Sequence, residues 1–324
     1  MSAEREERPL LLAYRSLGLG DFLTAVPALR ALARAYPEHR RVLCAPAALA
    51  PLLQLTASLD ELAETRALAV PESRWHGAQV AVNLHGRGPQ SHMALLAAAP
   101  ARLIAFDNAA AGHRGPRWRA DEHEVARWCR LLDEAGIPTE PGDLRLGVPP
   151  WDPPQGAAGA TVIHPGASSV ARRWPAERFA AVAREQREAG SVVAITGSFA
   201  ERALGERVAE LAGLDEASVW AGKTSLAELA AIAANAKRVI CGDTGMAHLA
   251  TAFGTPSVVI FGPTPPDLWG PPGDRPEHIV LWAGRTGDPH ANETDPGLLQ
   301  VTVDDALRAL DRLEATTSRP LSTA

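Results

Sequence analysis

Four residues that could hold an anionic ligand follow one short apolar stretch in the second half of the chain. Residues 238–241 have the length of a buried strand, and Asp243, Thr244, Gly245 and His248 come directly after them. Thr244 and His248 are four residues apart, so a helix that begins here carries both near its N-terminus. Because free backbone N–H groups at such an end bind phosphate, we predict the seat of a nucleotide diphosphate. An ordinary helix cap with a core histidine remains the alternative.

A second group of residues suited to phosphate lies near residue 170. The stretch 164–179 reads HPGASSVARRWPAERF, in which Ser168 and Ser169 follow an apolar strand, and Arg172 and Arg173 stand before Trp-Pro. Serine hydroxyl and amide groups hydrogen-bond to anionic oxygens, and guanidinium groups give bidentate, charge-assisted bonds to phosphate. This combination predicts a pyrophosphate site, while an exposed, solvated arginine pair is the alternative.

Two further motifs carry groups for the rest of a nucleotide. Glu201 follows a strand predicted at 192–196, where its carboxylate can accept hydrogen bonds from two ribose hydroxyls. The alternative is a carboxylate that stabilises the first turn of a helix. Residues 220–224 read WAGKT, but Ala217 stands where a phosphate-binding P-loop requires glycine. We therefore expect the loop that contains Thr224 to line an adenine pocket with its backbone groups.

In the first half of the chain, Asp21 is the candidate general base. It follows an apolar run at 10–14 and two glycines, Gly18 and Gly20, that let the backbone approach a substrate. Leu23 replaces the third glycine of a dinucleotide fingerprint, so a Rossmann cofactor site is disfavoured. A helix that begins here should favour the ionised form of Asp21, as a base that must accept a proton requires.

The acceptor side of the predicted site includes a second loop. Residues 80–84 form a candidate strand, and His85 and Arg87 leave its carboxyl end, where they are expected to line the same crevice as Asp21. A polar turn with exposed side chains is an equal alternative for both residues. We assign acceptor binding to these two residues together with the two glycines before Asp21.

The chemistry predicted from these groups needs no metal and no cofactor. The chain contains no Asp-x-Asp pattern and no cluster of His, Cys and carboxylate residues with metal-ligand spacing. The charge of a departing diphosphate would then be neutralised by arginine, hydroxyl groups and helix N-termini. This indicates a sugar nucleotide that loses its diphosphate while one carboxylate deprotonates an acceptor hydroxyl.

Strands and helices alternate along both halves of the chain, which predicts an α/β fold with two doubly wound, Rossmann-like domains facing each other across a cleft. The domains are predicted at 1–150 for the acceptor and 159–324 for the nucleotide sugar, with a Pro- and Gly-rich linker at about 136–158. The candidate strands are 10–14, 41–44, 67–70, 80–84, 102–106, 161–164, 192–196, 219–220, 238–241 and 257–261. The candidate helices are 47–53, 91–98, 121–135, 176–189, 200–212, 226–235 and 304–314, with a helix after Asp21 and a frayed tail from residue 315.

Composition limits the class of protein. The 324 residues are 46% apolar and 22% charged, with a net charge of −6, which is typical of a globular protein without a general attraction to nucleic acid. The first nine residues are too charged for a secretory signal, and no apolar run reaches the ~20 residues of a membrane helix. Three scattered cysteines fit buried thiols. We expect a cytoplasmic protein, and a peripheral membrane contact and the oligomeric state are left open.

Four stretches of the chain resemble glycosyltransferase family nine, the heptosyltransferases of lipopolysaccharide cores. They are residues 16–32 (SLGLGDFLTAVPALRAL), 164–179, 242–264 (GDTGMAHLATAFGTPSVVIFGPT) and 265–273 (PPDLWGPPG). The resemblance implies a GT-B fold and an inverting, metal-independent transfer from ADP-heptose. It assigns roles by motif: a catalytic aspartate at Asp21, phosphate-binding hydroxyls at Ser168 and Ser169, a basic residue at Arg173, a ribose-binding glutamate at Glu201, an adenine-proximal residue at Thr224, and a diphosphate and sugar seat at Asp243, Thr244, Gly245 and His248.

Two departures from the family bear on substrates. Arginine replaces the customary lysine, which keeps the charge and changes its geometry. Heptosyltransferases that act on lipopolysaccharide carry a basic acceptor face, whereas residues 45–99 offer only Arg66, Arg74 and Arg87. The acceptor is therefore expected to be a glycan or a small molecule. A sugar-nucleotide epimerase or hydrolase on the same fold and a non-catalytic nucleotide-sugar-binding protein are the alternative functions.

Overall fold

The computed structural model describes residues 8–317 of the chain, in two compact units, Met1–Gly147 (unit 1) and Val148–Ala324 (unit 2). The predicted linker at 136–158 contains the point where the chain passes from one unit to the other. Two predictions fall mainly outside the described residues. They are the absence of a secretory signal in the first nine residues and the frayed tail from residue 315. Within the described residues the last helix continues to Thr317.

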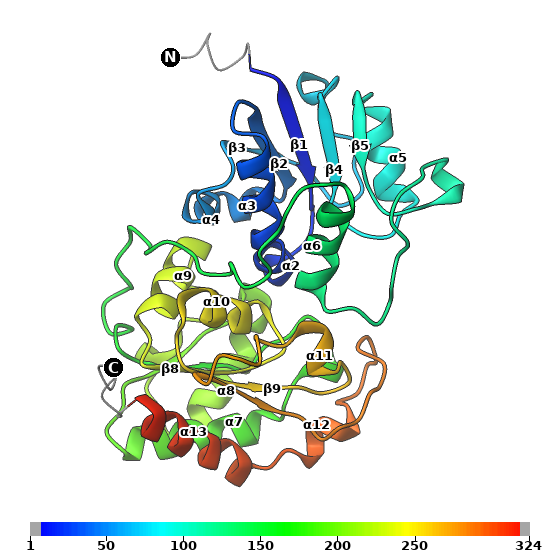
Figure 1. Cartoon of the computed structure of the whole chain (residues 1–324). Helices are drawn as coiled ribbons and strands as arrows, with labels where there is room; N and C mark the ends of the chain where they lie inside the picture. Colours follow the sequence, from blue (N-terminus) through cyan, green and yellow to red (C-terminus); the bar gives the residue numbers. More distant parts are fainter. Residues whose placement is uncertain (1–7, 318–324) are drawn as a thin grey trace, which may run out of the picture. The chain divides into compact units, whose positions relative to one another are not determined.

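Unit 1 contains a five-stranded parallel sheet with the strand order β3-β2-β1-β4-β5. Both faces of the central strand are covered, and Leu11, Leu12 and Ala13 are fully buried. A continuous apolar run of this kind is typical of a strand inside a parallel sheet. The strands are β1 (Leu10–Tyr14), β2 (Arg40–Ala45), β3 (Glu61–Glu64), β4 (Val80–Asn83) and β5 (Arg102–Ile104) (Figure 1).

The helix after β1 is divided into two. It was expected to run on continuously, but α2 (Leu19–Thr24) ends before Ala25, and α3 (Val26–Ala35) starts anew with Pro27 in its first turn. Proline has no N–H group and is best tolerated in a first turn, where no intrahelical partner exists. The side chains expected to point inward do so, since Phe22, Val26, Leu29 and Leu32 are buried. Unit 1 also contains α4 (Ala50–Leu53), α5 (Gln90–Ala97) and α6 (Glu124–Glu134).

The strand predicted at 67–70 is wrong. Leu68 has a left-handed backbone conformation with φ of 62° and is 48% exposed, and Val70 is 49% exposed, so this apolar stretch is a turn. The strand lies earlier, in β3, whose polar residues hide it from a hydrophobicity pattern. Because β3 is an edge strand, it has one partner only, and its Glu61 forms a bidentate pair with Arg40 of β2 at 2.7 and 2.9 Å.

Unit 2 repeats the plan with the strand order β10-β9-β8-β6-β7, again all parallel. Its strands are β6 (Thr161–His164), β7 (Val193–Ile195), β8 (Arg238–Gly242), β9 (Ser257–Ile260) and β10 (His278–Leu281). Its helices are α7 (Ala176–Glu188), α8 (Arg202–Ala212), α9 (Leu226–Asn235), α10 (Gly245–Phe253), α11 (Pro266–Trp269), α12 (Pro296–Gln300) and α13 (Val303–Thr317).

Three details of unit 2 differ from the predicted elements. The strand expected at 219–220 is a single bridge between Val219 and Ile195. The helix expected from residue 200 begins with a 3-10 turn, Phe199–Glu201, before α8. The edge strand β10 was not predicted, because its three apolar residues are only half-buried and its sequence, HIVL, is short.

Candidate functional site

The predicted donor residues of unit 2 lie at one edge of its sheet. In a parallel sheet all carboxyl ends lie on the same side, and β6 pairs with both β7 and β8. Ser168 follows β6, Glu201 follows β7, and Asp243 follows β8. The loop of Thr224 joins them, because the N–H of Gly222 donates to the carbonyl of Gly197 at 3.0 Å. The fold therefore gathers motifs that are up to about 80 residues apart in the chain.

The N-terminus of α10 is built from the Gly-Asp-Thr-Gly turn. Thr244 is the N-cap residue in extended conformation, with φ of −148° and ψ of 172°, and its side chain makes no capping hydrogen bond. Thr244, Gly245 and His248 are partly exposed, whereas Met246 is buried. His248 is therefore not the core histidine of the alternative interpretation. The first N–H groups of a helix have no partner one turn earlier, which suits a phosphate seat, although that of Ala247 donates to the carbonyl of Thr244 at 3.0 Å.

Arg172, and not the predicted Arg173, joins the residues around Asp243. Its guanidinium donates to the hydroxyl of Ser168 and lies 3.4 Å from the carboxylate of Asp243. Arg173 turns to another group, since its Nε donates to the carbonyl of Ala167 at 2.9 Å. Arg172 ends a 3-10 turn, while Arg173 has extended backbone. This change of conformation between neighbours sends the two guanidinium groups to different parts of the edge.

Glu201 has a structural contact that the sequence offered only as an alternative. Its Oε2 accepts hydrogen bonds from the backbone N–H and the hydroxyl of Ser198, both at 2.8 Å, in a capping box. Its other oxygen lies against Gly166, where an added Cβ would stand 2.1 Å from Oε1. Burial opposes ionisation, but the bonds from Ser198 and the charge of Arg173 outweigh it, so the pKa of the Glu201 carboxyl is lowered. The carboxylate is therefore ionised at neutral pH, and Oε2 is the oxygen that the capping box uses.

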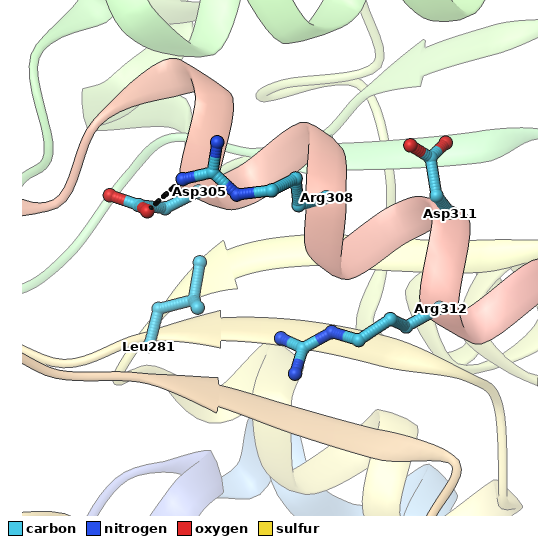
Figure 2. Close-up of a pocket in the computed structure, with 5 residues that line it drawn as sticks. All are labelled: Leu281, Asp305, Arg308, Asp311 and Arg312. Carbon is cyan, nitrogen blue, oxygen red and sulfur yellow. Dashed lines mark hydrogen bonds and ion pairs between the residues drawn. The ribbon is translucent and has the colours of Figure 1, made fainter.

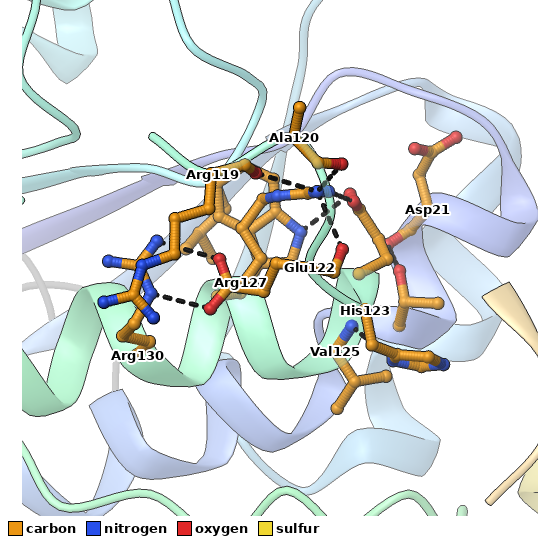
Figure 3. A network of polar contacts seen from close by, with 12 residues as sticks. Asp21, Arg119, Ala120, Glu122, His123, Val125, Arg127 and Arg130 are labelled. Carbon is orange, nitrogen blue, oxygen red and sulfur yellow. Dashed lines mark hydrogen bonds and ion pairs between the residues drawn. The ribbon is translucent and has the colours of Figure 1, made fainter. Parts of the chain in front are cut away.

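In unit 1, Asp21 lies in the first turn of α2, and its side chain is 30% exposed (Figure 3). Burial outweighs the backbone hydrogen bonds at this helix start, which favour the ionised form as expected. Burial raises the pKa of the Asp21 carboxyl, and the opposing charge of Arg15 does not fully compensate. A raised pKa makes the carboxylate a stronger base once it has lost its proton.

The loop after β4 is held by a buried amide. Asn83 accepts from the N–H of His85 at 3.0 Å and donates to His92 at 3.0 Å. The ring of His85 lies 5.4 Å from that of Tyr14 in β1. Burial and the charge of Arg15 lower the pKa of His85 to about 4, so its imidazole is neutral at neutral pH. Because His85 comes shortly after β4 and lies near the last residue of β1, it belongs to the groups at the carboxyl edge of the sheet.

Arg87, the other predicted acceptor residue of this loop, is exposed. Only its backbone is fixed, since its carbonyl accepts from Asn108 at 2.8 Å. Gly18 is the N-cap of α2 and Gly20 the second residue of this helix. All four residues assigned to the acceptor side thus belong to loops or helix starts at strand ends of unit 1.

Two residues that sequence reasoning missed, Arg15 and Glu124, surround Asp21. Arg15 follows β1 directly and lies 3.4 Å from the Asp21 carboxylate. Glu124 begins α6 and lies 2.9 Å from Arg15. The position of Arg15 beside the Gly-Asp motif was a usable signal. Nothing in the sequence joins it to Glu124, which is 109 residues away.

Other features of the described residues bear on cofactors and membranes. No three His, Cys, Asp or Glu side chains between residues 8 and 317 gather as metal ligands would. Within the same part of the chain, no helix combines the length and apolarity needed to cross a bilayer. A pocket of about 400 Å³ lies between β10 and α13, lined by Leu281 and by charged residues of α13 (Figure 2). It contains none of the predicted site residues.

Two parallel α/β units of this topology define the GT-B class of glycosyltransferase fold. The structure of E. coli ADP-heptose lps heptosyltransferase II superimposes with a TM-score of 0.76 at 20% identity, over 96% of this chain and all of that one. A glycosyltransferase family 9 structure from Veillonella parvula gives 0.75 at 19% identity, over 97% and 99%. The E. coli heptosyltransferase WaaC with ADP gives 0.69 at 18% identity, over 94% and 98%.

The chain belongs to glycosyltransferase family 9, the heptosyltransferase family, whose sequence profile matches residues 109–296. It is 32% identical over 159 residues to lipooligosaccharide heptosyltransferase 2 of Haemophilus influenzae, which covers 47% of this chain and 46% of that protein. It is 34% identical over 163 residues to lipopolysaccharide heptosyltransferase 1 of Pseudomonas aeruginosa, over 49% and 45%. The chain spans about half the length of these curated relatives. The profile match contains the donor residues of unit 2 and stops short of Asp21.

Proposed function

We propose that this protein is a heptosyltransferase that transfers heptose from ADP-heptose to a hydroxyl group of a saccharide acceptor. The observation that carries the proposal is the cluster of Arg172, Ser168 and Asp243 beside the N-terminus of α10. A cation, a hydroxyl group and free backbone N–H groups converge there, which is what a diphosphate binds. The family name supports heptose as the sugar, and similar structures named for ADP-heptose or solved with ADP support ADP as the nucleotide.

The two units are proposed to bind different substrates. Unit 2 binds the donor: Arg172, Ser168 and Ser169 contact the diphosphate with Thr244 and Gly245, Glu201 binds the ribose, and the loop of Thr224 lies near adenine. His248 faces the sugar beside Trp269, whose ring centroid is 6.0 Å away. Unit 1 binds the acceptor near Asp21 and His85. Arg173, which faces Glu201, is retained as a weaker candidate for donor binding.

The proposed reaction is a single displacement. Asp21 removes the proton of the acceptor hydroxyl, whose oxygen forms a bond to the anomeric carbon of heptose. The bond between that carbon and the β-phosphate oxygen breaks on the opposite face, ADP leaves with the electron pair, and the configuration inverts. Arginine, hydroxyl and N–H groups neutralise the leaving charge, so no metal ion takes part. The raised pKa of Asp21 suits a base that must hold the proton until it exchanges with water.

The acceptor is proposed to be an anionic saccharide of the lipopolysaccharide type. From the sequence, basic residues were counted only between residues 45 and 99. Three further arginines are exposed in the segment before α6, namely Arg114, Arg117 and Arg119. Together with the exposed Arg87 they provide cationic charge on unit 1. Such charge attracts phosphate and carboxylate groups of a core saccharide. Heptosyltransferase relatives are named for this class of acceptor.

Release of ADP tests the proposal. The protein is incubated with ADP-heptose in the presence of EDTA, with and without a heptose-free lipopolysaccharide core acceptor. Transfer predicts ADP release that depends on the acceptor and is unaffected by EDTA. Release without acceptor would indicate a hydrolase, and conversion of the donor sugar without ADP release an epimerase. Binding of ADP without any turnover would indicate a nucleotide-sugar-binding protein.

A further inference from the structure

Arg15 is a buried arginine that joins four elements of unit 1 beside Asp21. It is 1% exposed and follows β1. Its Nε donates to the carbonyl of Asp21 and one terminal nitrogen to the carbonyl of Leu84, after β4. The other terminal nitrogen reaches Thr24 at 3.1 Å, Glu124 at 2.9 Å and the Asp21 carboxylate at 3.4 Å. A planar guanidinium presents five N–H donors in a fixed fork that an ammonium lacks, and its second terminal nitrogen shares two hydrogens among Thr24, Glu124 and Asp21.

Glu124 fixes this arginine from the opposite side. Its Oε1 accepts from Arg15 and from the indole of Trp128, each at 2.9 Å, and its Oε2 accepts from Arg127. The Arg15 guanidinium also stacks on Trp128, 4.8 Å from the ring centroid. Burial opposes ionisation of Glu124, but the two arginines outweigh it and lower the pKa of its carboxyl. The ionised Glu124 carboxylate therefore offsets the free-energy cost of burying the charged Arg15.

The same network reaches the loop before α6. Arg127 donates to the carbonyls of Arg119, Ala120 and Glu122 at 3.3, 3.4 and 2.8 Å (Figure 3). Trp118 lies under this guanidinium, 4.5 Å from its centre. The contacts leave Arg127 held by backbone and by Glu124, so it is not available to Asp21. Of the two buried arginines in the described part of unit 1, only Arg15 contacts the candidate base.

We propose that Arg15, locked by Glu124, is the positioning residue that orients the Asp21 carboxylate for proton transfer. The proposal rests on the proposed function, because it takes Asp21 to be the base. Arg15 holds this residue at two points, the backbone carbonyl and the carboxylate, while the Asp21 side chain keeps 30% of its surface exposed for the acceptor. Glu124 competes for the same guanidinium nitrogen that faces Asp21.

The two partners act on Asp21 with opposite signs. Arg15 lowers the pKa of its carboxyl, and Glu124 raises it. The other charged and titratable groups on neighbouring elements are Arg127, which pairs with Glu124, and the histidines His85 and His123. His85, on the loop after β4, is neutral at neutral pH because its pKa is about 4. His123, at the start of α6, uses Nδ1 to accept from the N–H of Val125 at 3.2 Å. Substituting Arg15 and Glu124 should therefore move the titration of Asp21 in opposite directions.

Carboxyl-carbon NMR titration of full-length protein labelled at aspartate tests this directly. The Asp21 signal is assigned by its loss in Asp21→Asn. Arg15→Met should move its titration midpoint to higher pH, and Glu124→Gln to lower pH, each by about half a pH unit or more. Arg15→Lys keeps a cation, so its midpoint should lie between those of the wild type and Arg15→Met. Movement of both midpoints in one direction, or of neither, would overturn the proposal.

A matched control and a kinetic readout complete the test. Arg30 makes four hydrogen bonds in unit 1, to Thr56, Asp143 and Arg145, and none to Asp21. Arg30→Met should leave the Asp21 midpoint unchanged, and a shift there would contradict the proposal. The acid limb of kcat/KM for heptosyl transfer should follow the NMR midpoints. If the midpoints move as expected while Asp21→Asn still transfers heptose, the proposed function fails alone. If Asp21→Asn is inactive but the other variants keep wild-type midpoints, the role of Arg15 fails alone.

Discussion

Arg172 gives the sharpest prediction about the donor site, because its neighbour Arg173 is a natural control. The Arg172 side chain is 23% exposed and already contacts Ser168 and Asp243 beside the N-terminus of α10. A hydrogen bond to a charged partner contributes about 1.5–3 kcal/mol when it is partly shielded from water. Arg172→Gln removes this charged interaction with the diphosphate and leaves a shorter, neutral polar side chain. The dissociation constant for ADP should therefore rise about 10- to 150-fold.

Calorimetric titration with ADP in EDTA measures this effect. Arg172→Lys keeps the charge without the planar fork and should lie between the wild type and Arg172→Gln. Arg173→Gln should weaken binding less, because Arg173 turns to the carbonyl of Ala167 and to Glu201. A larger loss in Arg173→Gln than in Arg172→Gln would refute the assignment and restore the residue predicted from the motif.

The remaining predictions concern the base, the ribose and stability. Asp21→Asn should lower kcat for transfer by about 10²- to 10⁴-fold while ADP still binds, which steady-state kinetics and calorimetry check together. Gly166→Ala should displace the Glu201 carboxylate, because the new Cβ would stand 2.1 Å from Oε1. The dissociation constant for ADP, measured by calorimetry, should then rise about tenfold. An unchanged dissociation constant would show that Glu201 does not bind the ribose. Asp60 accepts from Arg41 at 2.8, 3.1 and 3.2 Å, and its pKa is lowered because these bonds and charges outweigh burial. Asp60→Asn should lower the free energy of unfolding by about 1–3 kcal/mol above pH ~4. In urea unfolding, the difference between wild type and variant should vanish as the pH falls through the pKa of Asp60 in the folded state. A difference that stays constant with pH would contradict this prediction.

The positions of the buried strands along the chain were predictable because apolar runs in a parallel sheet are continuous. β1, β8 and β9 are buried along nearly their whole length, and each was placed within one residue of its observed bounds. Edge strands lack this signal. In β3 the half-exposed Glu61 and the exposed Glu64 stand on either side of two apolar residues, so the strand has little apolar signal. The more apolar stretch around Leu68 is a turn because Leu68 has a left-handed backbone conformation.

The candidate site was predictable to the level of the motif and not of the individual contact. Parallel strands bring Ser168, Glu201 and Asp243 to one edge whatever the side-chain details are. The choice between Arg172 and Arg173 depends on one change of backbone conformation, which composition does not encode. The pair of Arg15 and Glu124 depends on how α6 packs beside β1, and only the folded chain brings them together.

The central claim is that this chain moves a heptosyl group to an acceptor hydroxyl without a metal ion. Mass spectrometry and anomeric NMR of the acceptor, after incubation with ADP-heptose in EDTA, measure that claim most directly. The account predicts an acceptor heavier by one heptosyl residue, whose anomeric configuration is opposite to that of the donor. An unmodified acceptor, a product that forms only when a divalent cation is restored, or a retained configuration would contradict it.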